Sequence, residues 1–285
     1  KSQHQVKKKI SFKLKERMIM KVLDFLAISP GEIATPVVTM GMFDGVHKGH
    51  QVLFQKTRHL AANKGVDPWV ITFNEHPRKI LCGVSPDIIM PLSKKLSLFA
   101  EFGMAGCMVI AFTAEVANIS AQIFVEKYLG KTLRIKGIVI GENFKFGKGG
   151  NGNPEFLKTV ADQYAFTVEV ITPVFNGAEA ISSTRVRQCV AQGNLPTARK
   201  MLGRPFSLLG KVYIGDQRGR NLGFPTANLK LYHDLKPPAG VYAGCTSHMG
   251  QIYASLISIG TCPTFQGTVE KIEVHLLDFD EDLYG

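Results

Sequence analysis

The spacing of hydrophobic and polar positions changes near residue 205 and divides the chain into two parts. In the first part, short runs of β-branched and aromatic residues alternate with stretches whose apolar residues recur at helical spacing. The runs predict strands at residues 37–41, 69–73, 108–112, 137–141 and 166–171, and the stretches predict helices at 50–63, 93–102, 120–130 and 154–164. Because strands alternate with helices, we expect an α/β fold with a doubly wound parallel sheet, which binds ligands at the carboxyl ends of its strands.

The second part, from residue 206 onward, shows almost no helical periodicity. Its apolar positions predict short strands, separated by Gly and Pro, at 208–213, 226–231, 240–245, 252–259 and 272–279. Strands at such short spacing indicate a small antiparallel β-barrel. Between the two parts, Pro196 opens and Gly203 closes a helical segment. We therefore expect a disordered basic extension at 1–20, an α/β domain at 21–187, a helical linker at 188–205 and a barrel domain at 206–285.

Composition limits the classes of protein that these domains can form. With 285 residues, of which 45% are hydrophobic, the chain is long enough for two cores, and no apolar run reaches membrane-spanning length. The net charge of +11 suggests a nucleic-acid partner. Residues 1 to 21, however, hold eight Lys and Arg against one Glu, so the rest of the chain has a net charge of only +4. A mildly basic body indicates local binding of a polyphosphate ligand rather than an extended nucleic-acid surface.

The cysteines indicate the redox environment. The chain has five, at Cys82, Cys107, Cys189, Cys245 and Cys262. Their odd number and wide spacing, without a C-x-x-C pair, are typical of reduced core residues rather than of a disulfide framework or a zinc site. We therefore expect a cytoplasmic protein.

The first candidate site follows directly after the strand expected at 37–41. From Gly41 to His50 the chain reads GMFDGVHKGH, which predicts a tight turn that leads into a helix. A helix N-terminus presents unpaired N–H groups and partial positive charge, and imidazoles can donate to phosphate and can carry charge near neutral pH. Gly49, between the two histidines, has no Cβ that would block a phosphate. An isolated H-x-G-H is as compatible with histidines that bind nothing, but this context favours a phosphate site.

A second candidate site lies about 130 residues later. Residues 181–187 read ISSTRVR, in which the hydroxyl residues are ordinary helix caps. Arg185 and Arg187 oppose the helix dipole in the first turn, so we expect a bound anion there.

These two segments resemble, in order, the two signatures of the bacterial bifunctional riboflavin kinase/FAD synthetase family. The resemblance implies a Rossmann-like nucleotidylyltransferase domain in which His47, His50 and Arg185 are catalytic. It also implies that ATP is bound by Gly41, Phe43, Asp44, Gly45, Gly49, Ser182, Ser183 and Thr184.

Two further segments of the first part resemble the flavin loops of the same family. Residues 72–77 read TFNEHP and residues 141–147 read GENFKFG. By resemblance, the flavin nucleotide is bound by His76, Pro77, Asn143 and Phe146. Without the resemblance, these segments read as turns after strands, and Phe146 reads as a core residue. Glu75 stands where the family has proline and Met42 where it has asparagine, so the flavin loop and the surroundings of His47 depart from the pattern.

The second part carries its own signatures. Residues 219–228 read GRNLGFPTAN, which resembles the riboflavin kinase signature, and the absence of a Walker motif excludes a P-loop kinase. By resemblance, Gly215, Arg220 and Pro225 bind ATP, and Thr226 and Asn228 hold Mg²⁺, which prefers oxygen ligands. The run IEVHLLDF at 272–279 resembles the family's final signature, which makes Glu273 the base for the riboflavin 5′-hydroxyl.

The resemblance implies an enzyme that phosphorylates riboflavin to FMN and adenylylates FMN to FAD, with release of pyrophosphate. Its expected substrates are riboflavin, FMN and ATP, its expected cofactor is Mg²⁺, and neither nucleic acid nor a membrane is an expected partner. The family continues beyond the position of Gly285, so we expect the barrel to be truncated.

Two other classes of function are compatible with parts of this pattern. Another H-x-G-H adenylyltransferase, for nicotinate mononucleotide or phosphopantetheine, or a fragment of a class I aminoacyl-tRNA synthetase would leave the second part unexplained. An RNA-binding protein would use the basic extension and the barrel, but the strands lack the clustered aromatics that stack bases.

Overall fold

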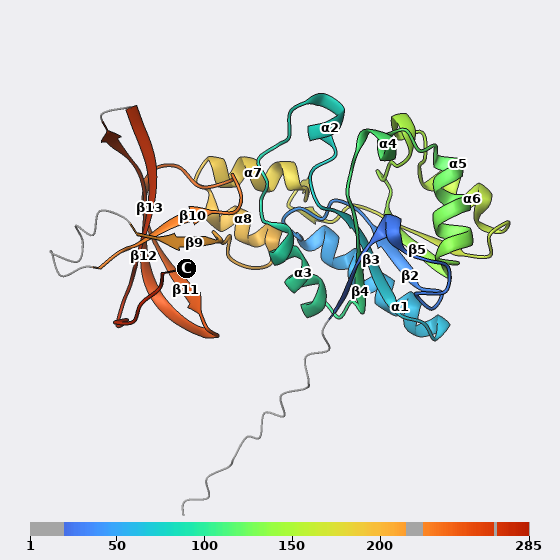
Figure 1. Ribbon diagram of the computed structural model, residues 1–285, viewed down its shortest axis with the longest axis horizontal. Coiled ribbons are helices and arrows are strands. Elements are labelled where there is room, and N and C mark those ends of the chain that lie inside the picture. The colour runs from blue at the N-terminus through green and yellow to red at the C-terminus, as the bar shows by residue number, and fades with distance from the viewer. Residues whose placement is uncertain (1–19, 215–224, 265–266, 285) are drawn as a thin grey trace, which may run out of the picture.

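The computed structural model describes residues 20–214, 225–264 and 267–284. They form an α/β unit and an antiparallel sheet, with the last two helices of the α/β part lying between them (Figure 1).

The α/β unit is built on six parallel strands in the order β1-β4-β3-β2-β5-β6. The strands are β1 (Lys21–Asp24), β2 (Val37–Met40), β3 (Pro68–Phe73), β4 (Gly106–Ile110), β5 (Gly137–Gly141) and β6 (Thr167–Ile171). The chain runs outward from β2 through β3 to β4 and then crosses back to β5, which pairs with the other side of β2. The predicted doubly wound parallel sheet is confirmed, and the carboxyl end of β2 lies where the winding reverses, the usual ligand position of such sheets.

Helices and turns connect these strands. The α-helices are α1 (Lys48–Lys64), α2 (Arg78–Cys82), α3 (Leu92–Glu101), α4 (Ala114–Ala117), α5 (Ala121–Ile123), α6 (Pro154–Ala161), α7 (Ser183–Ala191) and α8 (Leu195–Leu202). The 3₁₀ turns η1 (Phe25–Ala27) and η3 (Lys148–Gly150), the π-helix η2 (Phe124–Thr132) and the hairpin of β7 (Phe175–Asn176) and β8 (Glu179–Ala180) complete the unit. None of the described helices has the length and apolar content needed to cross a membrane.

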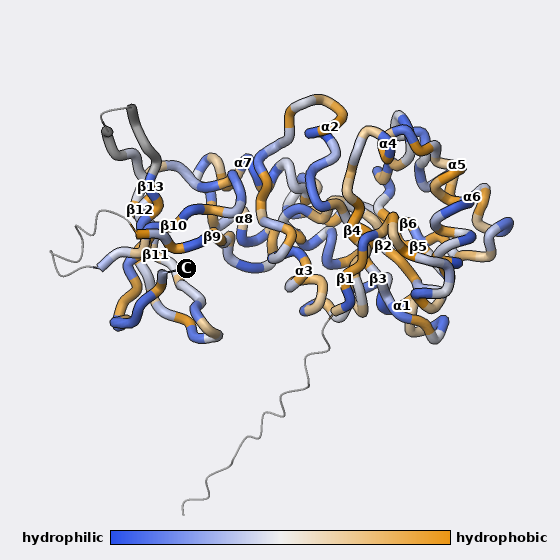
Figure 2. The backbone as a smooth tube through the Cα atoms, viewed as in Figure 1, coloured by the Kyte–Doolittle hydropathy of each residue, from blue (hydrophilic) through white to orange (hydrophobic). Residues whose placement is uncertain are grey.

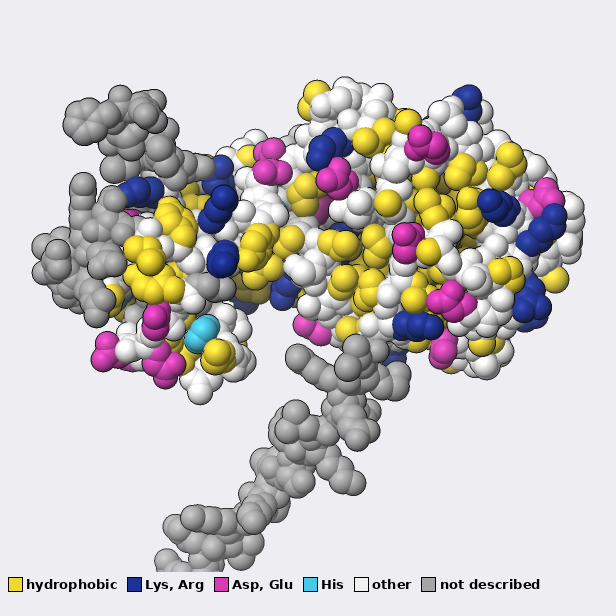
Figure 3. All heavy atoms as spheres, in the orientation of Figure 1, with side chains coloured by type: hydrophobic (Ala, Val, Ile, Leu, Met, Phe, Trp, Pro, Cys, Tyr) yellow, Lys and Arg dark blue, Asp and Glu magenta, His cyan; other side chains and the backbone are white. Residues whose placement is uncertain are grey.

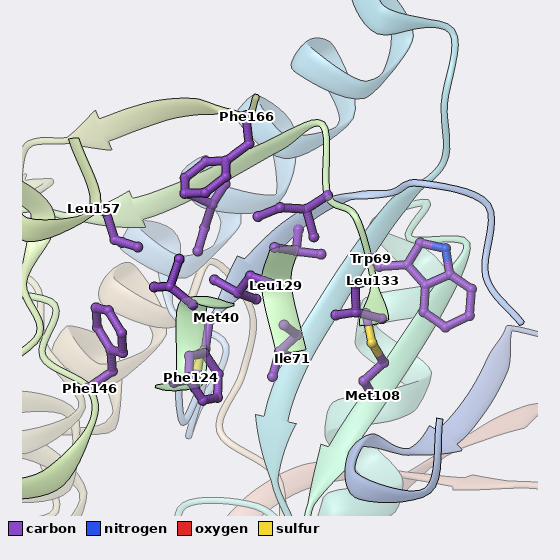
Figure 4. Packing of buried hydrophobic residues seen from close by; sticks show 14 of the residues in the cluster. Met40, Trp69, Ile71, Met108, Phe124, Leu129, Leu133, Phe146, Leu157 and Phe166 are labelled. Carbon is purple, nitrogen blue, oxygen red and sulfur yellow. The ribbon is translucent and has the colours of Figure 1, made fainter. Parts of the chain in front are cut away.

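Both faces of the central strands are buried. On one face, Met40 and Ile71 belong to a cluster with Phe124, Leu129 and Leu133 of the 124–133 segment (Figure 4). On the other face, Val37 and Val139 pack against Leu60 and Ala61 of α1. Strands covered on both faces are apolar throughout, which is why hydrophobic segments gather on β2, β4 and β5 (Figure 2).

Some element boundaries differ from the sequence-based prediction. The strand expected at 108–112 begins two residues earlier, because Gly106 already pairs with Trp69 of β3. Only glycine fits there, since an added Cβ would lie 2.3 Å from the indole ring. The strand β1 was not predicted, because it is a mostly exposed edge strand without an apolar run. The helix expected at 120–130 is a short α-turn that continues as the π-helix η2.

The second part is a five-stranded antiparallel sheet in the order β11-β12-β13-β10-β9. Its strands are β9 (Gly210–Tyr213), β10 (Ala227–Leu231), β11 (Gly240–His248), β12 (Gln251–Thr264) and β13 (Gly267–Leu276). The predicted antiparallel strands are confirmed. Within the described part of the chain the sheet is open, because the outer strands β9 and β11 each pair with one neighbour and not with each other.

The two parts meet through a segment that follows β10. Leu235 is buried with Ile89 and Leu202 in one cluster, and its N–H donates to the Ile88 carbonyl at 3.4 Å. Helix α7 spans the expected domain boundary at 187, and α8 with its C-cap Gly203 lies inside the expected linker.

Candidate active sites

The turn after β2 brings His47 and His50 into direct contact. Helix α1 begins at Lys48, and His47 is its N-cap, whose Nδ1 accepts the His50 backbone N–H at 3.4 Å. The two rings stack with their centroids 3.6 Å apart, and the edge of Phe43 packs against His50. The two histidines of the motif therefore form one unit at the N-terminus of α1.

Both imidazoles are held in their neutral form. Burial, and then the charge of Arg204, lower the pKa of His47 from 6.5 to about 4. Burial also lowers the pKa of His50 well below 6.5, and the next contributions come from His47, Lys95 and Arg204. An imidazole can carry charge near neutral pH, but in the ligand-free chain these two lowered pKa values favour uncharged rings. Because His47 Nδ1 accepts a hydrogen bond, the proton of the neutral ring lies on Nε2, which is a donor.

Two cations that the sequence analysis missed, one buried and one partly buried, donate to the carbonyls of this turn. Lys95 of α3 donates to the Met42 carbonyl at 3.1 Å. Arg204, after α8, donates to the carbonyls of Gly45 at 2.6 Å and Val46 at 3.0 Å. The only signal in the sequence is that Lys95 shares a helix face with two buried apolar residues, Leu98 and Phe99.

Asp44 is a structural anchor of the turn. Its carboxylate is buried and accepts the N–H groups of Ile89 at 3.1 Å and Met90 at 3.3 Å. Arg187 Nη2 donates to the same carboxylate at 2.6 Å. Since these donors satisfy Asp44, its side chain shapes the predicted ATP site from behind rather than facing it.

The second motif lies against the first. Ser182 caps α7, Ser183 Oγ donates to the Asp44 carbonyl at 2.8 Å, and Thr184 is exposed. Arg185 donates to the Ala180 carbonyl at 3.2 Å and forms an ion pair with Glu179. The anions expected beside the two arginines are thus protein carboxylates in this state.

Glycines allow the close approach of these segments. A Cβ on Gly49 would lie 3.1 Å from the His47 ring and 4.0 Å from the Ile181 carbonyl. Gly45 has a φ of +83°, and a Cβ there would lie 2.9 Å from Ile89. Gly41 donates its N–H to the Ile71 carbonyl and so continues the β2 to β3 pairing into the turn.

The loop after β3, predicted to hold flavin, borders the same edge of the sheet. His76 is half-buried, its Nδ1 accepts the Arg78 N–H at 3.2 Å, and burial followed by Arg187 lowers its pKa. Pro77 is the N-cap of α2. The N–H of Glu75 donates to Asn74 Oδ1 at 2.8 Å, a hydrogen bond that proline cannot make, so this departure from the family pattern is accommodated by a local turn.

The loop after β5 places the two residues predicted to bind flavin, Asn143 and Phe146, in different surroundings. Asn143 is exposed, whereas Phe146 is buried and packs against Phe144, Phe124 and Phe156 with centroid distances of 5.6, 5.6 and 6.2 Å. The direct flavin contact predicted for Phe146 is therefore not supported in this state, because aromatic packing directs its ring into the core.

In the second part, the strand register places two predicted residues opposite each other. Asn228 of β10 pairs with Glu273 of β13, and directly opposite residues project on the same face. Asn228 is buried, and its Oδ1 has no hydrogen-bond partner among the residues that the structure describes. His275 Nδ1 lies 2.8 Å from the Pro225 carbonyl, a contact that joins the residue before β10 to β13. Thr226, which follows Pro225, is half-buried. The predicted ATP contacts Gly215 and Arg220 lie outside the described residues.

A cavity of about 350 Å³ continues along β10 beyond Asn228. Its walls come from β9, β10, β13 and the segment after β10, and its lining residues are Tyr213, Leu229, Lys230, Leu231, His233, Asp234, Lys236 and Ile272.

Comparisons with known proteins match both parts in the same order. A model described as FAD synthetase matches residues 30–185, and one described as riboflavin kinase matches residues 202–285. The bifunctional riboflavin kinase/FMN adenylyltransferase of Escherichia coli K12 is 37% identical over 251 residues, which cover 87% of this chain and 80% of the relative. The protein of the same name from Listeria monocytogenes is 36% identical over 253 residues, with the same coverage.

A solved structure has the same overall fold. The crystal structure described as a macrolide-efflux protein from Streptococcus pneumoniae superposes with a TM-score of 0.81 and 33% identity, over 94% of this chain and 87% of that one. From the two matched domains, their order and these relatives, the chain belongs to the bifunctional riboflavin kinase/FMN adenylyltransferase family.

Proposed function

We propose that the second domain phosphorylates riboflavin to FMN with ATP, and that the first domain transfers AMP from a second ATP to FMN to give FAD and pyrophosphate. The observation that carries the proposal is the junction of two ATP motifs at the carboxyl edge of the parallel sheet, where Ser183 donates to the Asp44 carbonyl beside the His47 and His50 pair. Membership of the family supports the pairing of this site with a kinase domain.

In the first domain, an FMN phosphate oxygen attacks the α-phosphorus of ATP. A new P–O bond forms, the bond between the α-phosphorus and the bridging oxygen breaks, and its electron pair leaves with pyrophosphate. His47, protonated on Nε2, donates to an oxygen that gains charge, and the N-terminal N–H groups of α1 add further donors. Such a direct displacement needs positioning and charge stabilisation rather than a covalent enzyme intermediate.

Arg185 and Ser182, at the start of α7, are proposed to hold the β- and γ-phosphates. Arg185 must then exchange the Glu179 carboxylate for phosphate, which is feasible because Glu179 is mostly exposed and such pairs are weak. His76 and Asn143, on the loops after β3 and β5, are proposed to contact FMN.

In the second domain, Glu273 accepts the proton of the riboflavin 5′-hydroxyl as its oxygen attacks the γ-phosphorus and ADP leaves. Thr226 and Asn228 are proposed to hold Mg²⁺. The buried Asn228 Oδ1, which no described residue contacts by a hydrogen bond, fits an oxygen ligand of that ion. When bound, Mg²⁺ would neutralise charge on the phosphate oxygens.

The proposed partners are therefore small molecules. On the face shown in Figure 3, Lys and Arg side chains are interspersed with acidic and apolar groups, which supports local phosphate binding over a nucleic-acid surface. Cys82, Cys107, Cys189 and Cys245 are free, which supports the expected reducing, cytoplasmic location.

The two-site assignment is tested by incubating the chain with Mg·ATP and either riboflavin or FMN, followed by chromatography of the flavins. We expect FAD from both substrates. The His50→Ala variant is expected to convert riboflavin to FMN but to make no FAD. The Glu273→Gln variant is expected to make FAD only when FMN is supplied. A folded variant that lost both activities would contradict the assignment to separate sites. No product from the unmodified chain with either flavin would favour an adenylyltransferase for nicotinate mononucleotide or phosphopantetheine.

A further inference from the structure

Two cations, the buried Lys95 and the partly buried Arg204, contact the turn that carries His47 and His50, and neither belongs to its sequence motif. Lys95 is only 2% exposed, and its Nζ donates to the carbonyls of Met42 at 3.1 Å and Phe73 at 3.2 Å. Arg204 donates to the carbonyls of Gly45 and Val46 in the same turn. The turn is thus held by two charges from elements far away in the sequence.

These contacts fix the direction of the peptide groups. The C=O and N–H of a trans peptide point in opposite directions. Because the Met42 and Val46 carbonyls point toward the cations, the N–H groups of the next residues, Phe43 and His47, point away from them. A turn whose carbonyls face inward and whose N–H groups face outward is suited to bind an anion.

Lys95 also joins the two substrate loops. Its Nζ lies 3.5 Å from Thr72 Oγ1, and that hydroxyl donates to the Met42 carbonyl at 3.2 Å. Met42 follows β2 at the start of the phosphate turn, and Phe73 ends β3 at the start of the proposed flavin loop. One ammonium therefore sets the distance between the loop for the adenylyl donor and the loop for its acceptor.

Removal of these two charges from water does not by itself stabilise the fold. Burial lowers the pKa of Lys95 to about 8 and that of Arg204 to about 10, so both side chains are still protonated at neutral pH. Because the desolvation cost of a charge removed from water can exceed what its contacts return, we look for a role of these two side chains that needs positive charge. Both cations also lower the pKa of His50 and so favour the neutral imidazole pair.

We propose that Lys95 and Arg204 are positioning residues for adenylyl transfer, which orient the phosphate turn toward the triphosphate of ATP and hold it at a fixed distance from the flavin loop. This inference rests on the function proposed for the first domain. Neither side chain contacts the substrate, because the three acceptors around Lys95 engage its ammonium and the turn carbonyls engage Arg204.

The test compares Lys95→Met and Arg204→Met with Lys94→Met and Arg199→Met in the complete chain. Lys94 is the neighbour of Lys95 on α3, and Arg199 is an exposed arginine on α8. We expect the kcat for FMN adenylylation to fall on the order of a hundredfold in the first two variants, with a smaller change in the KM for ATP. Riboflavin phosphorylation in the same preparations should keep the rate of the unmodified chain, and both controls should resemble the unmodified chain in each assay.

A second readout separates positioning from simple packing. The charged and titratable groups that face His50 are His47 from the turn, Lys95 from α3 and Arg204 from the segment after α8. Removal of either cation should raise the pKa of His50, so the acid limb of the kcat profile should move to higher pH. Packing alone would change thermal stability without this movement.

The outcomes are distinct. If the unmodified chain makes no FAD from FMN, the proposed function fails. If it does, but Lys95→Met and Arg204→Met match their controls, the inference is overturned. Should these variants fail to fold, Arg204→Lys keeps the charge but cannot reproduce the fork of contacts to Gly45 and Val46. A lower adenylylation kcat with an unchanged kinase rate then supports the inference, and an unchanged kcat overturns it.

Discussion

The guanidinium of Arg187 donates to the buried carboxylate of Asp44 at 2.6 Å and joins two segments that lie 143 residues apart in the sequence. The ion pair explains why an arginine stands near the N-terminus of α7, against the helix dipole: its anion is a residue of the other motif. The same carboxylate holds the N–H groups of Ile89 and Met90, so one acidic residue connects three segments of the site.

Loss of Arg187 should destabilise the first domain. Arg187→Met leaves the 1%-exposed Asp44 carboxylate without its cation, which is expected to lower the free energy of unfolding by about 3 kcal/mol. Urea unfolding followed by Trp69 fluorescence measures this, because Trp69 is the only tryptophan in the chain and lies in the core of that domain. Arg199→Met is the control. Adding Asp44→Asn to Arg187→Met should recover part of the loss, and no difference from the control would contradict a stabilising pair.

The stability of the first domain should fall in mild acid. The pKa of His47 is lowered from 6.5 to about 4 in the folded chain, so folding favours the neutral ring. The unfolded chain binds a proton first as the pH falls, so the stabilisation is complete above pH 6.5 and is lost between pH 6.5 and 4. The loss from this group is about 3 kcal/mol.

His47→Asn should flatten this part of the curve of unfolding free energy against pH, whereas the control His59→Asn, an exposed position on α1, should keep the slope. An equal slope in all three chains would mean that other groups cause the acid sensitivity. His50, whose pKa is lowered in the same direction, is expected to leave a residual slope in His47→Asn.

The parts of the fold and site that local sequence encodes could be predicted. The strand, turn and helix around His47 and His50 depend on neighbouring residues, and the apolar strands are continuous because both faces of the sheet are buried. Lys95 and Arg204 could not be recognised in the same way. Their acceptors are backbone carbonyls, which look alike in every sequence, and a lysine on a helix usually reads as a solvated residue.

The positions of the remaining site residues depend on contacts that form only in the folded chain. Phe146 follows a strand in a flavin-like motif, yet the neighbouring aromatic residues turn its ring into the core. The pairing of Asn228 with Glu273 depends on the register of two strands 45 residues apart, and one residue of slippage would place the two side chains on opposite faces.

Removal of the carboxylate beside Arg185 should improve ATP binding. In Glu179→Gln the guanidinium no longer has to leave an ion pair before it contacts phosphate. Because Glu179 is mostly exposed, the ion pair is weak, and the KM for ATP in FMN adenylylation is expected to fall by up to about fivefold, with kcat unchanged. Initial rates at varied ATP measure this, with Glu115→Gln, an exposed position on α4, as the control. A rise in the KM would show instead that Glu179 holds Arg185 in its binding position.

Asn228 should show opposite effects on stability and on kinase activity. Its buried Oδ1 has no hydrogen-bond partner in the described part of the chain, so Asn228→Leu removes an unsatisfied polar atom. The leucine variant is expected to raise the free energy of unfolding by about 1 kcal/mol and to abolish riboflavin phosphorylation. Asn228→Asp keeps an oxygen ligand but buries a charge, so it should be less stable than the leucine variant and yet phosphorylate riboflavin faster. Thermal unfolding and FMN formation at varied Mg²⁺ measure the two effects, and FAD formation from supplied FMN should be the same in both variants. If activity followed stability across the pair, Asn228 would act in packing and the oxygen would have no part in holding Mg²⁺.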